Sequence, residues 1–365
     1  MSLCCYFIIG SIQNFYQNQT KFFLDIIIRK EIIMKRLPAE WQKQRAVLMA
    51  FPHKNSDWNS NLKSALVPFI RIAQAIAYAQ PVYILCDEPS DISGLFCSTR
   101  NMSFIKIETN DTWIRDFGYI SVIEDGMLKL LDFTFDGWGG KFESELDNLV
   151  NQRFHKKGYM GTTPLERIDF VLEGGAIESD GLGTIMTTSQ CLCNPNRNGG
   201  LSKDEVEEYL KLYLGAERIL WLDYGYLVGD DTDSHIDTLA RFVAEDTIMY
   251  LQCLNREDEH YEALREMERE LKGFRTFHGE PYRLIPLPMS TPKFGKDGNR
   301  LPATYANFLI TNGALVYPTY SVPEDKVAHK VFKDFFINRE IIPVECSRLI
   351  EEGGSLHCST MQVPF

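Results

Sequence analysis

The sequence predicts an α/β protein in which one supersecondary unit occurs five times. Five segments carry helical periodicity, and a short apolar strand candidate follows each of them. A doubly wound sheet is the alternative for alternating helices and strands. Such folds usually carry a G-x-G-x-x-G loop, and none opens a helix here. Five units that close into a ring would enclose one central site, lined by loops from several units.

The five predicted helices cover residues 62–79, 144–155, 203–214, 257–272 and 323–336. The third begins with Ser202 and Glu205 in capping-box spacing, and it ends at Gly215. The fourth opens after Asn255 and the fifth after Ser321, two residue types that favour helix starts.

The predicted strands fall into two sets. Those that directly follow a helix are residues 82–85, 168–172, 219–222, 283–287 and 341–344. Further apolar runs lie between the units, at 104–107, 128–133, 183–187, 247–251, 307–310 and 314–316. Each predicted helix thus has predicted strands both before and after it, as expected for a repeated unit of several strands and one helix.

Residues 1–33 differ in composition from the rest. Their first apolar run, 3–9, has no basic residue ahead of it, unlike a signal peptide. Their second run, 22–28, contains Asp25 and is too short to span a bilayer. We expect Met34 to be the natural start and the preceding segment to be a non-native or disordered extension. A short membrane anchor is the alternative.

The chain is acidic, with 38 Lys and Arg against 50 Asp and Glu and a formal net charge of −12. An acidic surface repels phosphate, which argues against nucleic acid as a partner. The same field favours a small cationic substrate. The alternative is that the charge only keeps the protein in solution.

The nine cysteines form no disulfide pattern, because their number is odd and no C-x-x-C pair occurs. This usage indicates reduced thiols and a cytoplasmic setting. Structural zinc usually needs paired cysteines or a Cys/His cluster at short spacing. The close pair Cys191 and Cys193 is interpreted as strand packing.

Four polar clusters interrupt the apolar pattern, at residues 110–118, 172–175, 229–237 and 353–358. Each follows or breaks an apolar run, so each is expected at a strand end or in a loop, where functional residues concentrate. Cys358 follows a Gly-Gly pair that permits close backbone approach. A buried packing role is the alternative for this cysteine unless a base and carboxylates converge on it.

His235 has four aspartates within five positions: Asp230, Asp231, Asp233 and Asp237. Nearby carboxylates favour the imidazolium form, and such a histidine can serve as acid and then as base. A solvated acidic loop is one alternative. A metal site is another, because His235 and Asp237 are two suitable ligands.

Asp116 and Glu173 are carboxylates in two further clusters, and Trp113 precedes Asp116 by three positions. An aromatic face beside a carboxylate suits a flat cation. The alternative for this segment is a core tryptophan with a surface ion pair. Taken together, one Cys, one His and several carboxylates match the hydrolysis of a guanidinium, which is planar, cationic and weakly electrophilic.

These motifs resemble the agmatine deiminase branch of the bacterial peptidylarginine deiminase family, within the guanidine-modifying (pentein) superfamily. The resemblance covers nearly all of residues 34–365, which are then expected to form a single catalytic domain. It rests on residues 111–118 (DTWIRDFG), 138–140 (WGG), 172–175 (LEGG), 193–198 (CNPNRN), 231–241 (DTDSHIDTLAR), 302–308 (PATYANF) and 353–362 (GGSLHCSTMQ).

The resemblance implies a fold and a role for each residue. The fold is a five-bladed, pseudo-symmetric α/β propeller of ββαβ units around a central site. Cys358 is then the nucleophile that forms a covalent amidino-thioether, His235 the general acid/base, and Glu173 the residue that orients and charges His235. Asp116 and Asp237 clamp the guanidinium, Trp113 lines the substrate channel, and Asp231 is an acidic contact to the substrate. The family uses no metal or organic cofactor.

The implied reaction converts agmatine into N-carbamoylputrescine and ammonia. A deiminase for peptidyl or free arginine is the alternative within the class, and a catalytically silent binding protein on the same scaffold is the alternative outside it. A metal-dependent hydrolase is a third option. Residues 49–53 and 356–362 depart from the usual agmatine deiminase pattern, which bears on the substrate more than on the reaction. A substrate carboxylate would need an extra cation, for which Arg115 is a candidate. No membrane partner is expected, and a homodimer stays open.

Overall fold

The structure, a computed structural model, describes residues 35–365. The expectation that residues 1–33 are a non-native extension therefore lies outside the described residues. Within 35–365, none of the helices combines the length and the apolar character that a membrane-spanning segment needs. The seven cysteines of this part of the chain are all free thiols.

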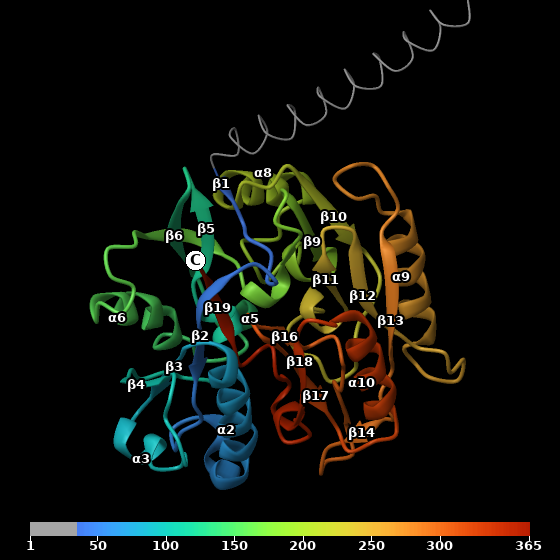
Figure 1. Cartoon of the computed structure of the whole chain (residues 1–365). Coiled ribbons are helices and arrows are strands. Elements are labelled where there is room, and N and C mark those ends of the chain that lie inside the picture. Colours follow the sequence, from blue (N-terminus) through green and yellow to red (C-terminus); the bar gives the residue numbers. More distant parts are fainter. Residues whose placement is uncertain (1–34) are drawn as a thin grey trace, which may run out of the picture.

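One pattern of strands and helix recurs in five of the sheets (Figure 1). Two antiparallel strands are followed by a helix, and a third strand then runs parallel to the second. Four of these units are continuous in the chain. They are β5 (Ile120–Glu124), β6 (Met127–Thr134), α6 (Val150–Lys156) and β7 (Leu165–Val171); β8 (Glu178–Ser179), β9 (Thr184–Thr188), α8 (Lys203–Leu214) and β10 (Arg218–Leu222); β11 (Ala240–Ala244), β12 (Thr247–Gln252), α9 (Tyr261–Gly273) and β13 (Arg283–Pro288); and β16 (Leu309–Ile310), β17 (Ala314–Thr319), α10 (Glu324–Phe335) and β18 (Glu340–Glu345).

The remaining unit combines the two ends of the described chain. It contains β2 (Gln44–Ala50), α2 (Leu62–Ala79), β3 (Val82–Cys86) and β4 (Met102–Lys106), with β3 parallel to both neighbours. The antiparallel partner of β2 is β19 (Met361–Pro364). The first unit therefore takes one of its strands from the far end of the sequence.

Short elements connect the units and carry most of the polar clusters. They are β1 (Lys35–Arg36), which pairs with β5; the antiparallel pair β14 (Lys293–Phe294) and β15 (Arg300–Leu301); the short helices α3 (Pro89–Ser93), α4 (Ile114–Phe117), α5 (Gly137–Gly140) and α7 (Ser189–Leu192); and the 3-10 turns η1 (Asp57–Asn61), η2 (Asp147–Leu149), η3 (Gly174–Ala176), η4 (Ile236–Thr238) and η5 (Leu349–Glu352).

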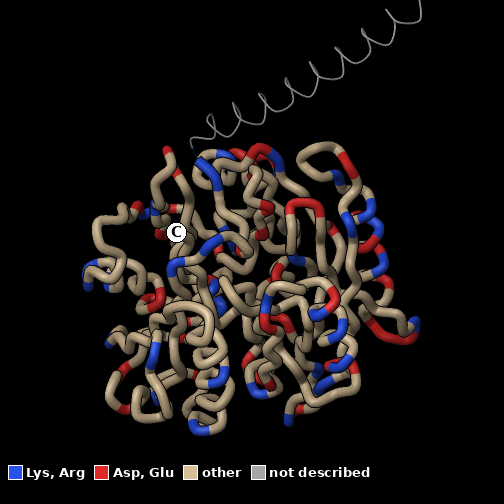
Figure 2. Tube along the Cα trace, in the orientation of Figure 1, with Lys and Arg blue, Asp and Glu red and all other residues tan. Residues whose placement is uncertain are grey.

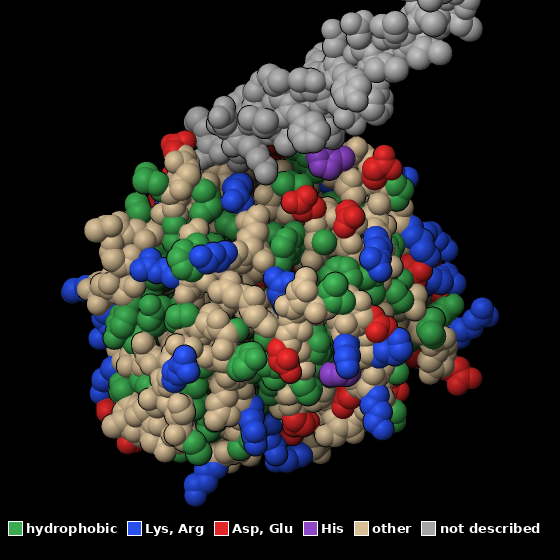
Figure 3. Space-filling view, in the orientation of Figure 1, with side chains coloured by type: hydrophobic (Ala, Val, Ile, Leu, Met, Phe, Trp, Pro, Cys, Tyr) green, Lys and Arg blue, Asp and Glu red, His purple; other side chains and the backbone are tan. Residues whose placement is uncertain are grey.

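The strands form separate small sheets rather than one doubly wound sheet, so the α/β class is confirmed and the doubly wound alternative is wrong. Figure 1 shows α2, α6, α8 and α9 at the periphery, with the units following one another around the molecule in chain order. Along α9, acidic and basic residues alternate (Figure 2), and Arg265, Arg269 and Lys272 pair with glutamates on the same helix. On the face shown in Figure 3, Lys and Arg side chains are scattered among acidic and apolar ones.

Two predicted helices have the expected ends. The α2 helix covers 62–79, and α8 has a complete capping box formed by Ser202 and Glu205 and ends at Gly215 in the left-handed conformation. The capping box supplies partners for the first free N–H groups, and glycine adopts the left-handed geometry without steric cost.

Two predicted helices, 144–155 and 257–272, begin several residues later than expected, because side chains bind backbone N–H groups at their predicted starts. For the segment 144–155, Asn110 Oδ1 accepts hydrogen bonds from the backbone N–H groups of Leu146 and Asp147, and the first part of the segment is a 3-10 turn before α6. Before α9, Asn255 and Asp258 each accept from a backbone N–H two residues on. These local bonds compete with helix formation.

Three hydrophobic clusters hold the units together. The largest includes β2, α2, β3 and β17 with the segment around Cys358, the second joins β5–β7 to α8, and the third lies between β11, β12 and α9. Because the polar clusters lie on the connections between these cores, they are held by well-packed elements.

Candidate active site

A cavity of about 510 Å³ opens where the connecting loops meet. Four predicted site residues line it: Cys358, Asp116, Trp113 and Asp231. The other three, His235, Glu173 and Asp237, lie behind the wall and are fully buried. The structure thus brings residues from the four sequence clusters to one place.

Cys358 lies in the connection between η5 and β19. The conformation and packing of this connection require the two glycines that precede Cys358. Gly353 has a φ of 80°, in the left-handed region. A Cβ atom on Gly354 would lie 2.5 Å from the ring of Trp113, so only glycine lets the loop pass this close to the indole. The thiol is buried, and its Sγ lies 3.4 Å from Oδ1 of Asn307, to which it donates.

The environment of Cys358 disfavours the thiolate in the absence of a cation. Burial raises the pKa of the Cys358 thiol well above its ordinary value, and the charges of Asp237 and Asp116 raise it further. A positive group placed between the sulfur and these carboxylates would reverse the effect.

Asp116 and Asp237 are fixed by different partners. Asp116 Oδ2 accepts from the indole Nε1 of Trp138 at 3.0 Å, and its Oδ1 accepts from the backbone N–H of Gly175 at 3.0 Å. Asp237 Oδ2 lies 2.7 Å from Nδ1 of His357. Its Oδ1 is buried without a hydrogen-bond partner among the described residues.

The pKa values of the two carboxyl groups are shifted in opposite directions. Burial raises the pKa of Asp116 well above its ordinary value, and the charges of Asp237 and Glu173 add to this. Burial acts on Asp237 in the same direction, but the hydrogen bond with His357 and the charges of His357, His235 and Arg241 together outweigh it and lower the pKa of Asp237. Two neighbouring carboxyl groups therefore have opposite tendencies to ionise.

Gly175, in η3, is the point at which these groups converge. A Cβ atom there would lie 2.6 Å from His235 Nδ1, 2.8 Å from Asp116 Oδ1 and 3.3 Å from Asp237 Oδ2. No other residue type fits without displacing them. The acid/base candidate and both clamp candidates thus surround one small space.

His235 is presented by a strained turn. Asp233 and Ser234, directly before it, have φ angles of 65° and 67°, which residues other than glycine seldom adopt. The turn is held by Asp230, whose Oδ2 accepts from the backbone N–H of Ser234, and by Lys141, whose Nζ binds Asp233. His235 Nδ1 lies 3.6 Å from Asp116 Oδ1.

The expectation that neighbouring aspartates keep His235 protonated is wrong for this arrangement. Burial lowers the pKa of His235 to about 3; the charge of Asp237 opposes this, and that of Arg197 adds to it. Asp230 does not help, because it accepts hydrogen bonds within its own loop. His235 is therefore a neutral imidazole, able to accept a proton.

Glu173 is bound by Arg197, which sequence reasoning did not assign a role. Arg197 Nε lies 2.6 Å from Glu173 Oε1, and its Nη1 lies 2.6 Å from Asp233 Oδ2. Glu173 Oε2 and His235 Nε2 are both buried without a hydrogen-bond partner among the described residues. The arginine thus fixes the carboxylate while leaving one oxygen free.

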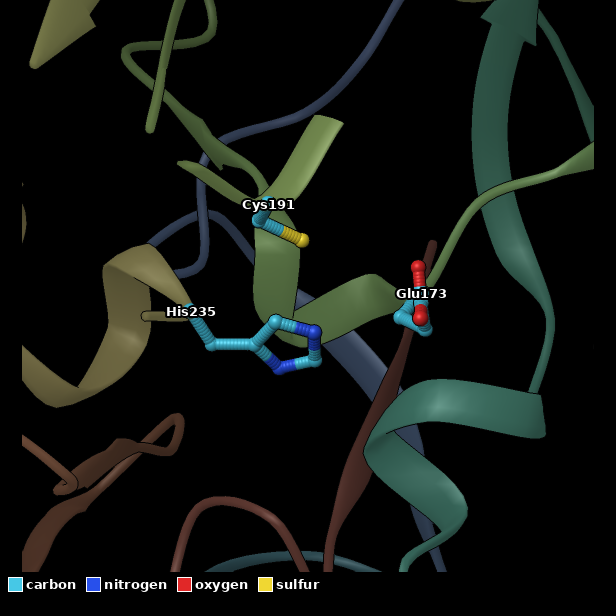
Figure 4. Close-up of side chains that lie close together, drawn as sticks. All are labelled: Glu173, Cys191 and His235. Carbon is cyan, nitrogen blue, oxygen red and sulfur yellow. The ribbon is translucent and has the colours of Figure 1, made fainter. Parts of the chain in front are cut away.

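Cys191 shares this space. It lies on α7, so its interpretation as strand packing is wrong, and its side chain points toward Glu173 and His235 (Figure 4). Each of the three residues offers one possible ligand atom, and these atoms lie within 4.8 Å of one another. Among the described residues, Glu173, Cys191 and His235 form the one group of three potential metal ligands whose donor atoms lie this close together.

The cavity wall is predominantly acidic. Trp113 is buried against Trp58, with ring centroids 5.9 Å apart, so the tryptophan is part of the core as well as of the wall. Asp231 lies on the wall with Asp111, and burial raises the pKa of both, that of Asp111 to about 7. Arg115 does not reach this cavity: it is buried, and its Nη2 lies 3.5 Å from Glu40.

Behind Asp237 lies a buried network that the sequence analysis missed. His357 Nε2 lies 2.6 Å from Glu40 Oε2, which also lies 3.0 Å from Arg241 Nη2. Arg241 in turn pairs with Glu178. His357, Arg241, Asn307, Trp138 and Arg197 all lie in motifs that carry the family resemblance, and polar residues inside those motifs were the available signal.

The comparisons with known proteins agree on one family. The model of the Porphyromonas-type peptidyl-arginine deiminase family matches residues 36–364. A protein of Legionella pneumophila (strain Paris) named "Putative agmatine deiminase" is 34% identical over 335 residues, which cover 90% of this chain and 95% of that protein.

Solved structures match over the same extent. An agmatine deiminase of C. jejuni with substrate bound is 40% identical, with a TM-score of 0.86 and coverage of 91% of this chain and 97% of that chain. A Porphyromonas gingivalis protein named "Putative Arginine Deiminase" is 45% identical, with a TM-score of 0.87 and coverage of 90% and 98%.

Proposed function

The chain belongs to the Porphyromonas-type peptidyl-arginine deiminase family, and we propose that it is a hydrolase that converts agmatine into N-carbamoylputrescine and ammonia. The observation that carries this proposal is the convergence of His235, Asp116 and Asp237 on Gly175, beside a cavity with Cys358 in its wall. A thiol, a neutral imidazole and two carboxylates are the groups that guanidinium hydrolysis requires.

The proposal extends to the architecture, a five-bladed pseudo-symmetric propeller of ββαβ units. The shared strand and helix pattern of five sheets supports it, as does the pairing of β19 with β2, which brings the end of the sequence back to the first unit. The site would then lie where the connections of all units meet.

Binding would begin with the guanidinium between Asp116 and Asp237. Oδ1 of Asp237 is a buried acceptor without a partner among the described residues, and a guanidinium N–H that reached it would satisfy it. The cation also lowers the pKa of Asp116, which burial raises, and so favours its ionised form. Two carboxylates then fix the plane of the substrate.

The same cation would activate Cys358. Its charge offsets the two aspartates that disfavour the thiolate, and His235 takes the thiol proton. The sulfur attacks the guanidinium carbon to give a tetrahedral adduct. The imidazolium returns the proton to the departing nitrogen, and ammonia leaves behind a covalent amidino-thioether on Cys358.

Water would complete the reaction. His235, neutral again, deprotonates a water molecule that attacks the amidino carbon. The second tetrahedral adduct collapses with loss of the Cys358 thiolate and leaves the urea group of N-carbamoylputrescine. Glu173 would hold the imidazole through the face that carries Nε2, while Nδ1 faces the reacting groups.

Wall charge supports agmatine over arginine. The far end of agmatine is an ammonium, and the wall offers the carboxylates of Asp57, Asp111 and Asp231. The earlier candidate for a carboxylate site, Arg115, is buried away from the cavity. Lys296, which lies on the wall, favours the second candidate function, deimination of free or peptidyl arginine, because its ammonium would bind a carboxylate.

Two measurements test the proposal. Ammonia release is compared for agmatine, arginine and a short peptide that ends in arginine, and a preference for either arginine substrate would replace agmatine. Intact-mass spectrometry after mixing with agmatine is expected to show an amidino adduct that Cys358→Ala abolishes. Turnover by Cys358→Ala would overturn the mechanism, and absence of turnover with every substrate would favour a silent binding protein.

A further inference from the structure

We propose that Glu173, Cys191 and His235 form a binding site for one divalent cation of the Zn²⁺ type, and that the bound ion silences the reaction. The inhibitory part rests on the proposed function. The binding part rests on the geometry of the three side chains alone, so the two are tested separately.

The three residues enclose a space with free ligand atoms. Their side chains point toward one another (Figure 4), their donor atoms lie within 4.8 Å of each other, and none is more than 1% exposed. Glu173 Oε2 and His235 Nε2 have no hydrogen-bond partner among the described residues. Buried polar atoms rarely stay unpaired, and coordination of one ion would satisfy both.

The donor set selects the class of metal. A thiolate, an imidazole nitrogen and a carboxylate oxygen suit Zn²⁺ or Co²⁺ rather than Mg²⁺ or Ca²⁺, which prefer oxygen. Ligand bonds of roughly 2.0–2.3 Å in a tetrahedron place donor atoms about 3.5 Å apart. The three side chains therefore need to close by about 1 Å, and water would fill the fourth position.

Local charges can accommodate the ion. Arg197 is adjacent, but its guanidinium is neutralised by Asp233 and it uses only Oε1 of Glu173. The Cys191 thiol would lose its proton to solvent as the metal–sulfur bond forms. The thiolate and Glu173 then match the two charges of the cation.

Coordination through Nε2 would remove His235 from the reaction. Its other nitrogen, Nδ1, lies 3.6 Å from Asp116 Oδ1 and faces the reacting groups. With a metal on Nε2, the imidazole keeps its proton on Nδ1 and cannot accept the one from Cys358. Because the ligands are buried, the ion must enter through a local opening, and we expect slow onset.

The binding test uses full-length protein freed of metal by a chelator. Co²⁺ is the optical probe, because thiolate coordination gives a charge-transfer band, and equilibrium dialysis with Zn²⁺ gives the stoichiometry. Wild type, Cys358→Ala and the control Cys193→Ser are expected to bind one ion and show the band. Cys193 is matched to Cys191 because it lies two residues away but is only partly buried. Cys191→Ser is expected to lose the band and to bind at least about 100-fold more weakly.

Two outcomes would overturn the site: no stoichiometric binding by wild type, or a band that survives Cys191→Ser and disappears in Cys358→Ala, which would locate the metal at the nucleophile. The activity test measures ammonia release by each variant twice, once with Zn²⁺ and once with chelator, and compares the two rates of the same variant. Slow inhibition of wild type and of Cys193→Ser, reversed by chelator and reduced in Cys191→Ser, supports inhibition, whereas binding without inhibition refutes that part. If chelator-treated wild type releases no ammonia, the proposed function fails while the binding result stands.

Discussion

Replacing Gly175 by alanine tests the proposed convergence of groups with a single methyl group. The new Cβ atom would lie 2.6 Å from His235 Nδ1 and 2.8 Å from Asp116 Oδ1, where ordinary contacts are about 3.4 Å or longer. The groups must therefore separate by about 0.6–0.8 Å. They cannot rotate away freely, because Asp116 is bound by Trp138 and by the Gly175 backbone itself.

A displacement of this size is expected to lower kcat/KM about 100-fold, since misplacement by about 1 Å costs that much in a preorganised site. A factor of 100 corresponds to about 2.7 kcal/mol of transition-state stabilisation. The assay is steady-state ammonia release from agmatine, with a thermal melt to show that the variant folds. Gly273→Ala is the matched control, because its Cβ atom meets nothing within 4 Å. If Gly175→Ala keeps kcat/KM within about threefold of the control, the groups do not act together as argued.

Three further predictions follow from single contacts. Trp138→Phe removes the indole N–H that binds Asp116, and we expect kcat/KM for agmatine to fall about tenfold with the melting temperature nearly unchanged; an unchanged kcat/KM would contradict the role of this bond. Burial raises the pKa of Asp111 to about 7, so the wall gains negative charge as the pH rises through about 7, and KM for agmatine should fall over that range in initial-rate measurements. Asp111→Asn should abolish this pH dependence, and an identical profile would exclude Asp111 as its source. Gly215→Ala forces a side chain into a left-handed residue, where its Cβ atom would lie 2.1 Å from the carbonyl oxygen of Lys35; we expect a loss of at least about 1 kcal/mol in a denaturant titration, and no loss would show that the loop relaxes.

Local signals in the sequence located the helix of each unit and the strand that follows it, but they missed the strands β2, β5, β8 and β11. The apolar face of α2 and the capping box of α8 are complete within their own segments, so both helices have the predicted ends. The start of α6 is different, because it depends on the hydrogen bonds that the backbone of Leu146 and Asp147 donates to Asn110, in another part of the chain. Strand β19 also escaped prediction, since its partner β2 lies more than three hundred residues away in sequence.

Some residues of the candidate site could likewise be predicted from the sequence, and others could not. Residue type and clustering singled out Cys358, His235 and the carboxylates, because few other residues can serve as nucleophile, base or clamp. Arg197 and His357 were missed because their roles come from their contacts. Arg197 binds Glu173 and His357 binds Asp237, and only the fold brings these residues together. The protonation of His235 was predicted wrongly because neighbours in sequence were counted while burial was unknown.

The pairing of β19 with β2 affects the order in which this protein can become active. Cys358 is held three residues before β19, and β19 docks on a strand that leaves the ribosome hundreds of residues earlier. Contacts so distant in sequence form late in folding, since the loop between them costs entropy. The four other units can therefore assemble on the growing polypeptide while Cys358 is still unsynthesised, and the candidate site is completed only as a last step of maturation.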